Sequence, residues 1–182
     1  MERSAITVVL LPNAKDSKQL VACSTALGRQ HDSLIALGPS ALPHVTVAQF
    51  YAPESAALEL WKQVSHLPAK VTELRSTAFC YFPESNRRMT WIELGFLKTV
   101  AVNELHTAVL QTEFARTHEI RSRRGDEFRP HCTLGLAEGK GTFPFDLAPY
   151  DIFGRAFTDV TLSVGVNGDD FTYSRALFPE RR

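Results

Sequence analysis

The sequence predicts an α+β protein with a largely antiparallel sheet. Segments in which apolar and polar residues alternate are mixed with about three segments whose apolar residues recur at helical spacing. Several strand-like segments follow one another across short turns, which indicates hairpins, whereas a doubly wound parallel sheet needs a helical crossover between its strands. The 182 residues are 44% apolar, and no linker or low-complexity run divides them, so we expect residues 1–182 to form a single domain.

The first half of the chain is typical of strand, helix, strand, helix. Residues 6–11 are β-branched and apolar and stop at a Pro-Asn pair, and residues 44–50 alternate after a proline. A helix with a cap at Asp16 or Ser17 lies between these two strands. A second helix follows and ends before Pro68, because the residue that precedes a proline disfavours helical dihedral angles.

The second half begins with a hairpin. Residues 71–82 and 89–94 are strand-like and flank a turn at residues 83–86. Thr99 then caps a helix, in which apolar residues at helical spacing supply a buried stripe. The remaining expected elements are a strand over residues 131–136, which follows a basic loop, and a terminal hairpin of residues 160–166 and 171–178 around an Asn-Gly turn.

Charge and cysteine content exclude several classes of protein. Lysine plus arginine number 20 and aspartate plus glutamate also number 20, so no global charge attracts long nucleic acid or an anionic membrane. Cys23, Cys80 and Cys132 are odd in number and have no C-x-x-C spacing, which argues against a disulfide framework and a structural zinc site. The first apolar segment is too short to span a bilayer. We therefore expect a cytoplasmic protein with no membrane association.

Two distant segments share a sequence pattern. Residues 43–47 read Pro-His-Val-Thr-Val and residues 130–134 read Pro-His-Cys-Thr-Leu. In a regular strand, residues i and i+2 project from one face about 7 Å apart, so His44 with Thr46, and His131 with Thr133, each face one space. Regular alternation would also place Ala48 on the face of His44. Histidine at a strand end and threonine as a strand former explain one such pattern, but not the proline and apolar flanks of both.

Two convergent imidazoles suit the cleavage of a phosphoester. A neutral imidazole can take a proton from water or a ribose hydroxyl, while a protonated imidazole gives one to the leaving oxygen. The hydroxyls of Thr46 and Thr133 would donate hydrogen bonds to the non-bridging phosphate oxygens. This chemistry needs no metal and no other cofactor, and which histidine acts as the base stays open at this point.

The paired patterns resemble the two H-x-T motifs of the 2H phosphoesterase superfamily, which includes the 2′,5′ RNA ligase-like cyclic phosphodiesterases. His44-Val45-Thr46 and His131-Cys132-Thr133 lie 87 positions apart, and residues 128–134 look especially like the second motif of that family. The resemblance implies a bilobed α+β fold with two pseudo-symmetric, mainly antiparallel sheets flanked by helices. It also implies a central cleft with one motif from each lobe, and metal-independent hydrolysis of a cyclic phosphate or a 2′,5′-linked phosphodiester.

Further candidates surround the motifs. Arg129 precedes His131 by two residues and is the best candidate for a phosphate contact among the arginines of the basic loop. Tyr51 follows the first motif and could stack on a base, whereas Phe82 and Trp91 are expected in the core. The other four histidines lack the motif and are expected at the surface or on helix faces. Cys132 points away from His131 by strand alternation, which argues against a nucleophilic role.

Two functions of different classes remain in view. The first is a phosphodiesterase that acts on a nucleotide or a short RNA or oligonucleotide, with His44 and His131 as its acid-base pair. The alternative is a non-catalytic module of the same fold that binds a nucleotide or RNA end. Two titrating groups favour the enzyme, because binding alone needs hydroxyls and arginines more. The substrate could be a 2′,3′-cyclic nucleotide, an RNA terminus, a 2′,5′-oligonucleotide or a cyclic dinucleotide. We expect a monomer without an obligate protein partner.

Overall fold

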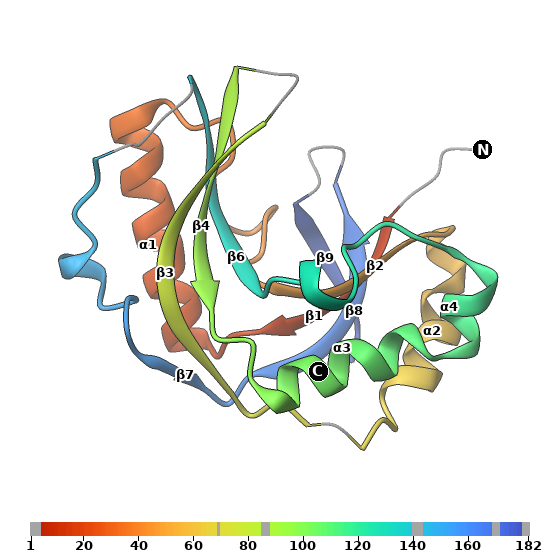
Figure 1. Ribbon diagram of the computed structural model, residues 1–182. Coiled ribbons are helices and arrows are strands. Elements are labelled where there is room, and N and C mark those ends of the chain that lie inside the picture. Colours follow the sequence, from red (N-terminus) through yellow and green to blue (C-terminus); the bar gives the residue numbers. More distant parts are fainter. Residues whose placement is uncertain (1–4, 69, 85–87, 140–143, 169–171, 180–182) are drawn as a thin grey trace.

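Two antiparallel sheets form the framework of the molecule (Figure 1). The computed structural model describes residues 5–68, 70–84, 88–139, 144–168 and 172–179. In order across the five-stranded sheet, the strands are β5 (Glu119–Ile120), β2 (Val45–Tyr51), β1 (Ala5–Leu11), β8 (Thr161–Asn167) and β9 (Tyr173–Phe178). In order across the four-stranded sheet, they are β6 (His131–Glu138), β4 (Met89–Phe96), β3 (Glu73–Pro83) and β7 (Ala156–Thr158).

The helices are α1 (Ala14–His31), α2 (Ala57–Val64), α3 (Val100–Leu110) and the short α4 (Glu113–Thr117), with single 3-10 turns at Glu54–Ala56, Gly125–Glu127 and Ala148–Tyr150. The predicted α+β class with antiparallel sheets is therefore confirmed. Among the described residues, no helix is both long enough and apolar enough to cross a membrane.

The predicted elements are present, with corrections at their ends. Thr99 caps α3 as expected, because its side chain accepts a hydrogen bond from the backbone N–H of Val102. The cap of α1 is Asn13, not Asp16 or Ser17, since the Asn13 side chain accepts from the Asp16 N–H. The elements α4, β5 and β7 were not predicted, because they are too short to show a period. The predicted hairpin turns lie partly outside the described residues, at 85–87 and 169–171.

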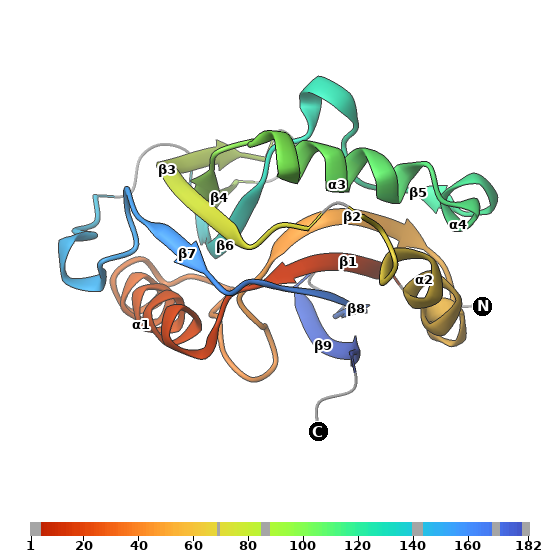
Figure 2. The ribbon, with the colours of Figure 1, turned by 90° about the horizontal axis from the view of Figure 1, so that it is seen from below.

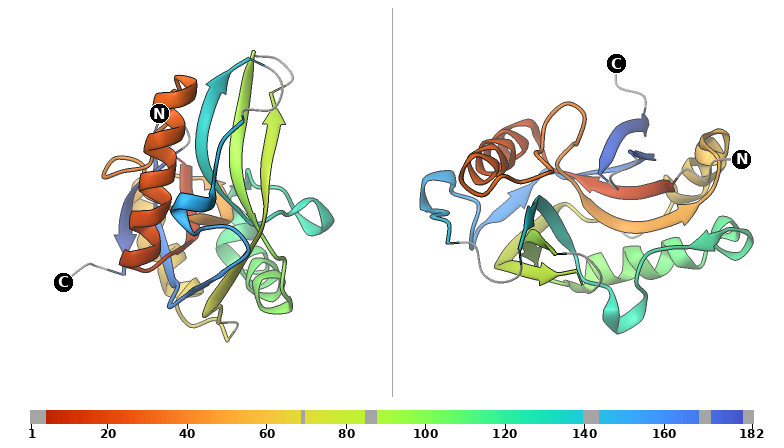
Figure 3. Two further views of the ribbon diagram at one scale, coloured as in Figure 1. Left: turned by 90° about the vertical axis from the view of Figure 1, so that its left-hand side faces the viewer. Right: turned by 90° about the horizontal axis from the view of Figure 1, so that it is seen from above.

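Each motif strand packs against a helix from the other half of the chain. The first-half helix α1 packs against β6, whereas the second-half helix α3 packs against β2 (Figure 2). Figure 3, which shows the molecule from one side and from above, shows α1 lying along the four-stranded sheet. Ser24 on α1 donates a hydrogen bond to the carbonyl oxygen of Leu134 at 2.6 Å, and Ser33 after α1 donates to the Leu136 carbonyl at 3.2 Å. Each motif strand is thus supported by a helix from the other half of the chain.

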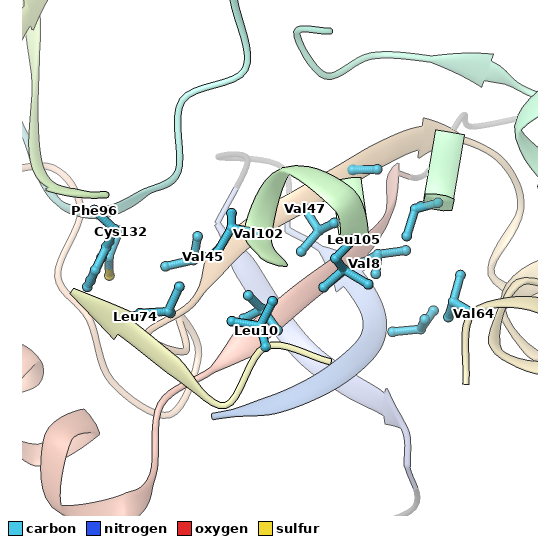
Figure 4. Close-up of a cluster of buried hydrophobic side chains, with 14 of the residues drawn as sticks. Val8, Leu10, Val45, Val47, Val64, Leu74, Phe96, Val102, Leu105 and Cys132 are labelled. Carbon is cyan, nitrogen blue, oxygen red and sulfur yellow. The ribbon is translucent and has the colours of Figure 1, made fainter. Parts of the chain in front are cut away.

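One hydrophobic core joins both sheets and the helices (Figure 4). It contains Val45 and Val47 from β2 together with Cys132 from β6, all of them almost completely buried. These side chains alternate with those of the H-x-T residues, so their burial turns the motif side chains toward the opposite face. Burying a Val or Leu side chain of this kind contributes about 1.5–3 kcal/mol to folding, so the face that each motif presents is strongly specified.

A β-bulge follows each motif. Val8 faces Ala48 and Val9 faces Thr46, which leaves Val47 as the extra residue of β2. In β6 the extra residue is Leu134. The bulge in β2 changes the phase of the strand, so the expectation for Ala48 is wrong: Ala48 is completely buried, and Gln49 takes its place beside Thr46.

His106 on α3 holds the bulge of β2 in place. Its Nδ1 donates to the carbonyl oxygen of Val47 at 2.7 Å, and its ring stacks on Phe128 with centroids 3.8 Å apart. The residue is 1% exposed, so of the two expected placements the helix face holds and the surface does not: His106 lies on the buried face of α3. Burial lowers the pKa of His106, with a smaller contribution from the Lys98 charge and despite the opposing Val47 bond. The imidazole therefore serves as a neutral hydrogen-bond donor to an irregular strand.

We expect Gly165→Ala to destabilise the protein. A Cβ at Gly165 in β8 would overlap the backbone oxygen of Arg175 and lie 2.7 Å from Cζ of Tyr173. Overpacking of this kind costs about 1–3 kcal/mol, because a backbone atom cannot move aside as a flexible side chain can. Chemical denaturation should show this loss in the free energy of unfolding.

Gly38→Ala is the matched control, because a Cβ there has no neighbour within 4 Å. Its effect should stay within about 0.5 kcal/mol. Equal stabilities of the two variants would contradict the close packing of Tyr173 on β8.

Candidate active site

The two H-x-T motifs line one cleft. Strands β2 and β6, which belong to different sheets, contact one another near the middle of the molecule. His44 and Thr46 from the first motif, and His131 and Thr133 from the second, line a cleft with a volume of about 570 Å³. This volume is within the range of small-molecule sites. All four side chains are partly buried, so they remain open to the cleft.

The two imidazoles are held by equivalent hydrogen bonds, each to the carbonyl oxygen two residues earlier. Nδ1 of His44 donates to the carbonyl oxygen of Leu42 at 2.8 Å, and Nδ1 of His131 donates to the carbonyl oxygen of Arg129 at 2.8 Å. A carbonyl oxygen can only accept, so the proton of each neutral ring is on Nδ1. Nε2 of each ring is therefore the atom that gains and loses a proton.

His44 is held in its neutral form by its surroundings. Its ring packs against Tyr173 with centroids 5.2 Å apart. The pKa of His44 is lowered to about 4, chiefly by burial and to a smaller extent by the nearby charge of His131, against the opposing effect of the Leu42 hydrogen bond. Near neutral pH the Nε2 atom of His44 consequently carries a lone pair that can accept a proton.

His131 lies beside a carboxylate that the sequence reasoning missed. Glu93 on β4 is directly opposite Thr133 and has only 7% of its side chain exposed. One carboxylate oxygen, Oε1, lies 3.5 Å from Nε2 of His131. The other, Oε2, accepts a hydrogen bond from the Arg129 guanidinium at 2.8 Å. A single acidic residue within the apolar run of β4 was the available signal, because buried carboxylates are rare unless they are paired.

The structure separates the remaining predicted site residues. Arg129 lines the cleft, but its guanidinium is engaged by Glu93 and stacks on Phe82, with its central carbon 3.4 Å from the ring centroid. Tyr51 is not among the residues that line the cleft, and its ring lies 5.5 Å from the central guanidinium carbon of Arg121. The Arg129 guanidinium is therefore paired with Glu93, whereas Tyr51 lies farther along β2 and outside the lining of the cleft.

Gln49 adds a polar group to the cleft that regular alternation had assigned to the other face. Its Nε2 donates to Thr7 Oγ1 at 3.3 Å, and the Thr7 hydroxyl donates to Asn167 Oδ1 at 2.5 Å. Gln49 and Asn167 line the cleft, while Thr7 is buried beneath them. This chain of hydrogen bonds fixes the amide of Gln49 next to the first motif.

Aromatic and basic side chains form the rim of the cleft. Phe82 and Trp91 line it, which corrects their expected placement in the core, and Arg121 and Arg123 line it from the basic loop. An aromatic face can stack on a base, and a guanidinium can pair with a phosphate. The cleft thus offers both kinds of contact that a nucleotide makes.

The cysteines are free thiols and do not contribute to this chemistry. Burial raises the pKa of Cys132 to about 12, with a smaller contribution from the Glu93 charge and against a backbone hydrogen bond at His44. Burial likewise raises the pKa of Cys23 to about 12. Thiols of this kind remain protonated and unreactive near neutral pH. Within the part of the chain that the structure describes, no group of three His, Cys, Asp or Glu side chains is arranged to hold a metal ion.

Solved structures with the same fold relate this chain to known proteins. No protein-family model and no curated protein matches it. It is similar to apo E. coli LigT, with a TM-score of 0.56, 11% identity, and coverage of 97% of this chain and 94% of LigT. A solved structure described as a phosphoesterase gives a TM-score of 0.54 at 13% identity, with coverage of 96% and 93%. E. coli LigT in complex with 3′-AMP gives 0.53 at 15% identity, with coverage of 96% and 93%. The expected fold is therefore confirmed as one that this chain shares with E. coli LigT.

We expect His44 to titrate far below an ordinary histidine. Nitrogen-15 NMR of the imidazoles should show His44 with its proton on Nδ1 at neutral pH and a midpoint near pH 4. A short unstructured peptide that contains one histidine provides the reference in the same buffer. A His44 midpoint equal to that of the peptide would contradict the burial that lowers the proton affinity of His44.

The same shift makes folding stability depend on pH. Unfolded His44 takes up its proton near the ordinary pKa of 6.5, whereas folded His44 does so only near 4. The unfolded state therefore binds more protons between these values, so the stabilisation is complete above about pH 6.5 and is lost as the pH falls toward 4. His44→Ala should reduce this loss, although His106, whose pKa is also lowered, will retain part of it.

Proposed function

We propose that this protein is a metal-independent phosphodiesterase that hydrolyses a cyclic phosphate or a 2′,5′-type phosphodiester of a nucleotide or RNA end. The observation that carries the proposal is the pair of identically held imidazoles in one cleft, each with Nε2 as its titrating atom. Binding alone would not need two such groups, whereas phosphodiester hydrolysis uses one to accept a proton and one to donate it.

The reaction follows from the four motif side chains. A phosphate between the motifs receives hydrogen bonds from the hydroxyls of Thr46 and Thr133 on its non-bridging oxygens. One Nε2 removes a proton from a water molecule as that oxygen bonds to phosphorus. The other Nε2 gives its proton to the ester oxygen as the bond from phosphorus to that oxygen breaks. Charge on the histidine pair is conserved, because one proton enters the pair as another leaves.

The rim of the cleft supports a nucleotide as the substrate. Trp91 and Phe82 offer aromatic surface beside the second motif, and Arg121 and Arg123 offer positive charge. E. coli LigT, whose fold this chain shares, has been solved in complex with 3′-AMP. These contacts support a nucleotide or a short oligonucleotide as the substrate.

We further propose that residues 1–182 act as a single two-lobed domain and as a monomer. The exchange of α1 and α3 between the sheets supports this, since neither half could keep its motif strand covered without the other. The motif residues of the cleft also come from one chain. The free thiols of Cys23 and Cys132 fit a reducing compartment, which we take to be the cytoplasm.

The proposal is tested by turnover in the presence of EDTA. The substrates to compare are 2′,3′-cyclic nucleotides, RNA with a terminal phosphate, 2′,5′-linked oligonucleotides and cyclic dinucleotides, with phosphorus NMR to locate the phosphate in the product. At least one class should be hydrolysed at an undiminished rate in chelator. Tight binding without turnover of any class would favour the alternative of a binding module, and rate loss that zinc, manganese or magnesium restores would contradict the metal-independent mechanism.

His44→Ala and His131→Ala should each lower kcat/KM at least about a hundredfold, because each removes a group that transfers a proton. Thr46→Val and Thr133→Val should have smaller effects, since each removes one hydrogen bond to the phosphate. His66→Ala is the matched control, because this histidine is exposed and outside the cleft, and its kcat/KM should stay at the wild-type level. Near-normal turnover by the double histidine variant would show that the assignment is wrong.

A further inference from the structure

The two histidines have the same backbone hydrogen bond but opposite electrostatic surroundings. His44 packs against an aromatic ring, and the charge of His131 lowers its pKa. Nε2 of His131, in contrast, faces the buried carboxylate of Glu93 at 3.5 Å. The two motifs are therefore similar in backbone geometry but differ in the charges around their histidines.

We propose that Glu93 is a positioning residue that favours the charged form of His131 and aims its Nε2–H, so that His131 is the general acid and His44 the general base. This inference rests on the proposed function. It assigns a direction to the reaction: the attacking water lies on the His44 side of the phosphate and the leaving oxygen on the His131 side.

Arg129 explains how a carboxylate can remain charged in this place. Glu93 is almost completely buried, and an isolated buried carboxylate would be neutralised by a proton. The Arg129 guanidinium donates to Oε2 and rests on the Phe82 ring, and its side chain is 37% exposed. Water therefore screens the Arg129 charge more than that of Glu93, and the remaining oxygen, Oε1, is directed at His131. An imidazolium at that position gains a carboxylate partner, whereas a neutral ring gains none.

The other titratable groups around this pair do not reverse the effect. Cys80 on β3 is opposite Glu93 on the far side of β4, and burial together with the Glu93 charge raises the pKa of its thiol, so it stays neutral. His44 faces His131 across the cleft and is neutral above about pH 4. Glu84, Glu127, Arg121 and Arg123 also line the cleft. Among the described residues, Glu93 is the one whose carboxylate pairs with His131 within 4 Å.

The first test does not need a substrate. In Glu93→Gln the charge is lost but the shape of the side chain is kept, so imidazole NMR at one fixed pH should show a smaller protonated fraction of His131 than in the wild type. Glu93→Asp should keep most of the wild-type fraction. Glu127→Gln is the matched control, because it removes a carboxylate that lines the cleft but is not the one paired with His131. An unchanged protonated fraction of His131 in Glu93→Gln, or an equal change in Glu127→Gln, would overturn the proposal.

The second test uses turnover. The kcat/KM profile of Glu93→Gln should lose activity at lower pH on its falling limb than the wild type, while its rising limb stays in place. A residue with a merely structural role would lower the whole profile without moving that limb. If no substrate is turned over by the wild type, the proposed function fails, but the NMR titration still decides the role of Glu93.

The direction of the reaction is tested with the leaving group. A nucleoside p-nitrophenyl phosphodiester releases a stable phenolate that needs no acid, whereas a 2′,3′-cyclic nucleotide releases a ribose oxygen that does. His131→Ala should lose at least about a hundredfold on the cyclic substrate but less than about tenfold on the nitrophenyl ester. His44→Ala should lose about a hundredfold on both. The opposite pattern would reverse the acid and the base and overturn the proposal.

Discussion

The structure of the site depends on one repeated hydrogen bond, from Nδ1 of each motif histidine to the carbonyl oxygen two residues earlier. This bond fixes the tautomer of each ring and leaves Nε2 as the atom that gains and loses a proton. The proline that precedes each histidine, Pro43 or Pro130, supports the extended backbone on which that geometry depends. The histidines of both lobes are therefore preorganised before any substrate binds, which is the condition under which general acid-base catalysis is efficient.

The rest of the fold holds these two short segments against one another. A shared hydrophobic core packs against β2 and β6 on the face opposite the motif side chains, and each strand also contacts a helix from the other half of the chain. The bulges at Val47 and Leu134 repeat the same irregularity in both lobes, and His106 secures the first of them from α3. A symmetric backbone then receives asymmetric neighbours. Tyr173 and burial keep His44 neutral, while Glu93 and Arg129 place a charge beside His131.

Much of this arrangement could be predicted from the sequence, and the exceptions have physical reasons. The H-x-T pairs and the Thr99 cap were found because they depend on neighbours within a few residues. Gln49 was missed because a bulge is set by the register between strands, which alternation along one strand does not reveal. Glu93 was missed because its partners, Arg129 and His131, are distant in the chain and meet only across β4 and β6.

The proposed mechanism requires both motifs to hold one phosphate, and a crystal structure of the protein with orthovanadate would show whether they do. Vanadate takes the trigonal bipyramidal shape of a phosphoryl transition state. The structure should show one vanadate between the histidines, with Nε2 of His44 and Nε2 of His131 on opposite sides and the hydroxyls of Thr46 and Thr133 on its equatorial oxygens. A vanadate held by one motif alone, with the other histidine beyond hydrogen-bond distance, would contradict a shared site and the acid-base pair with it.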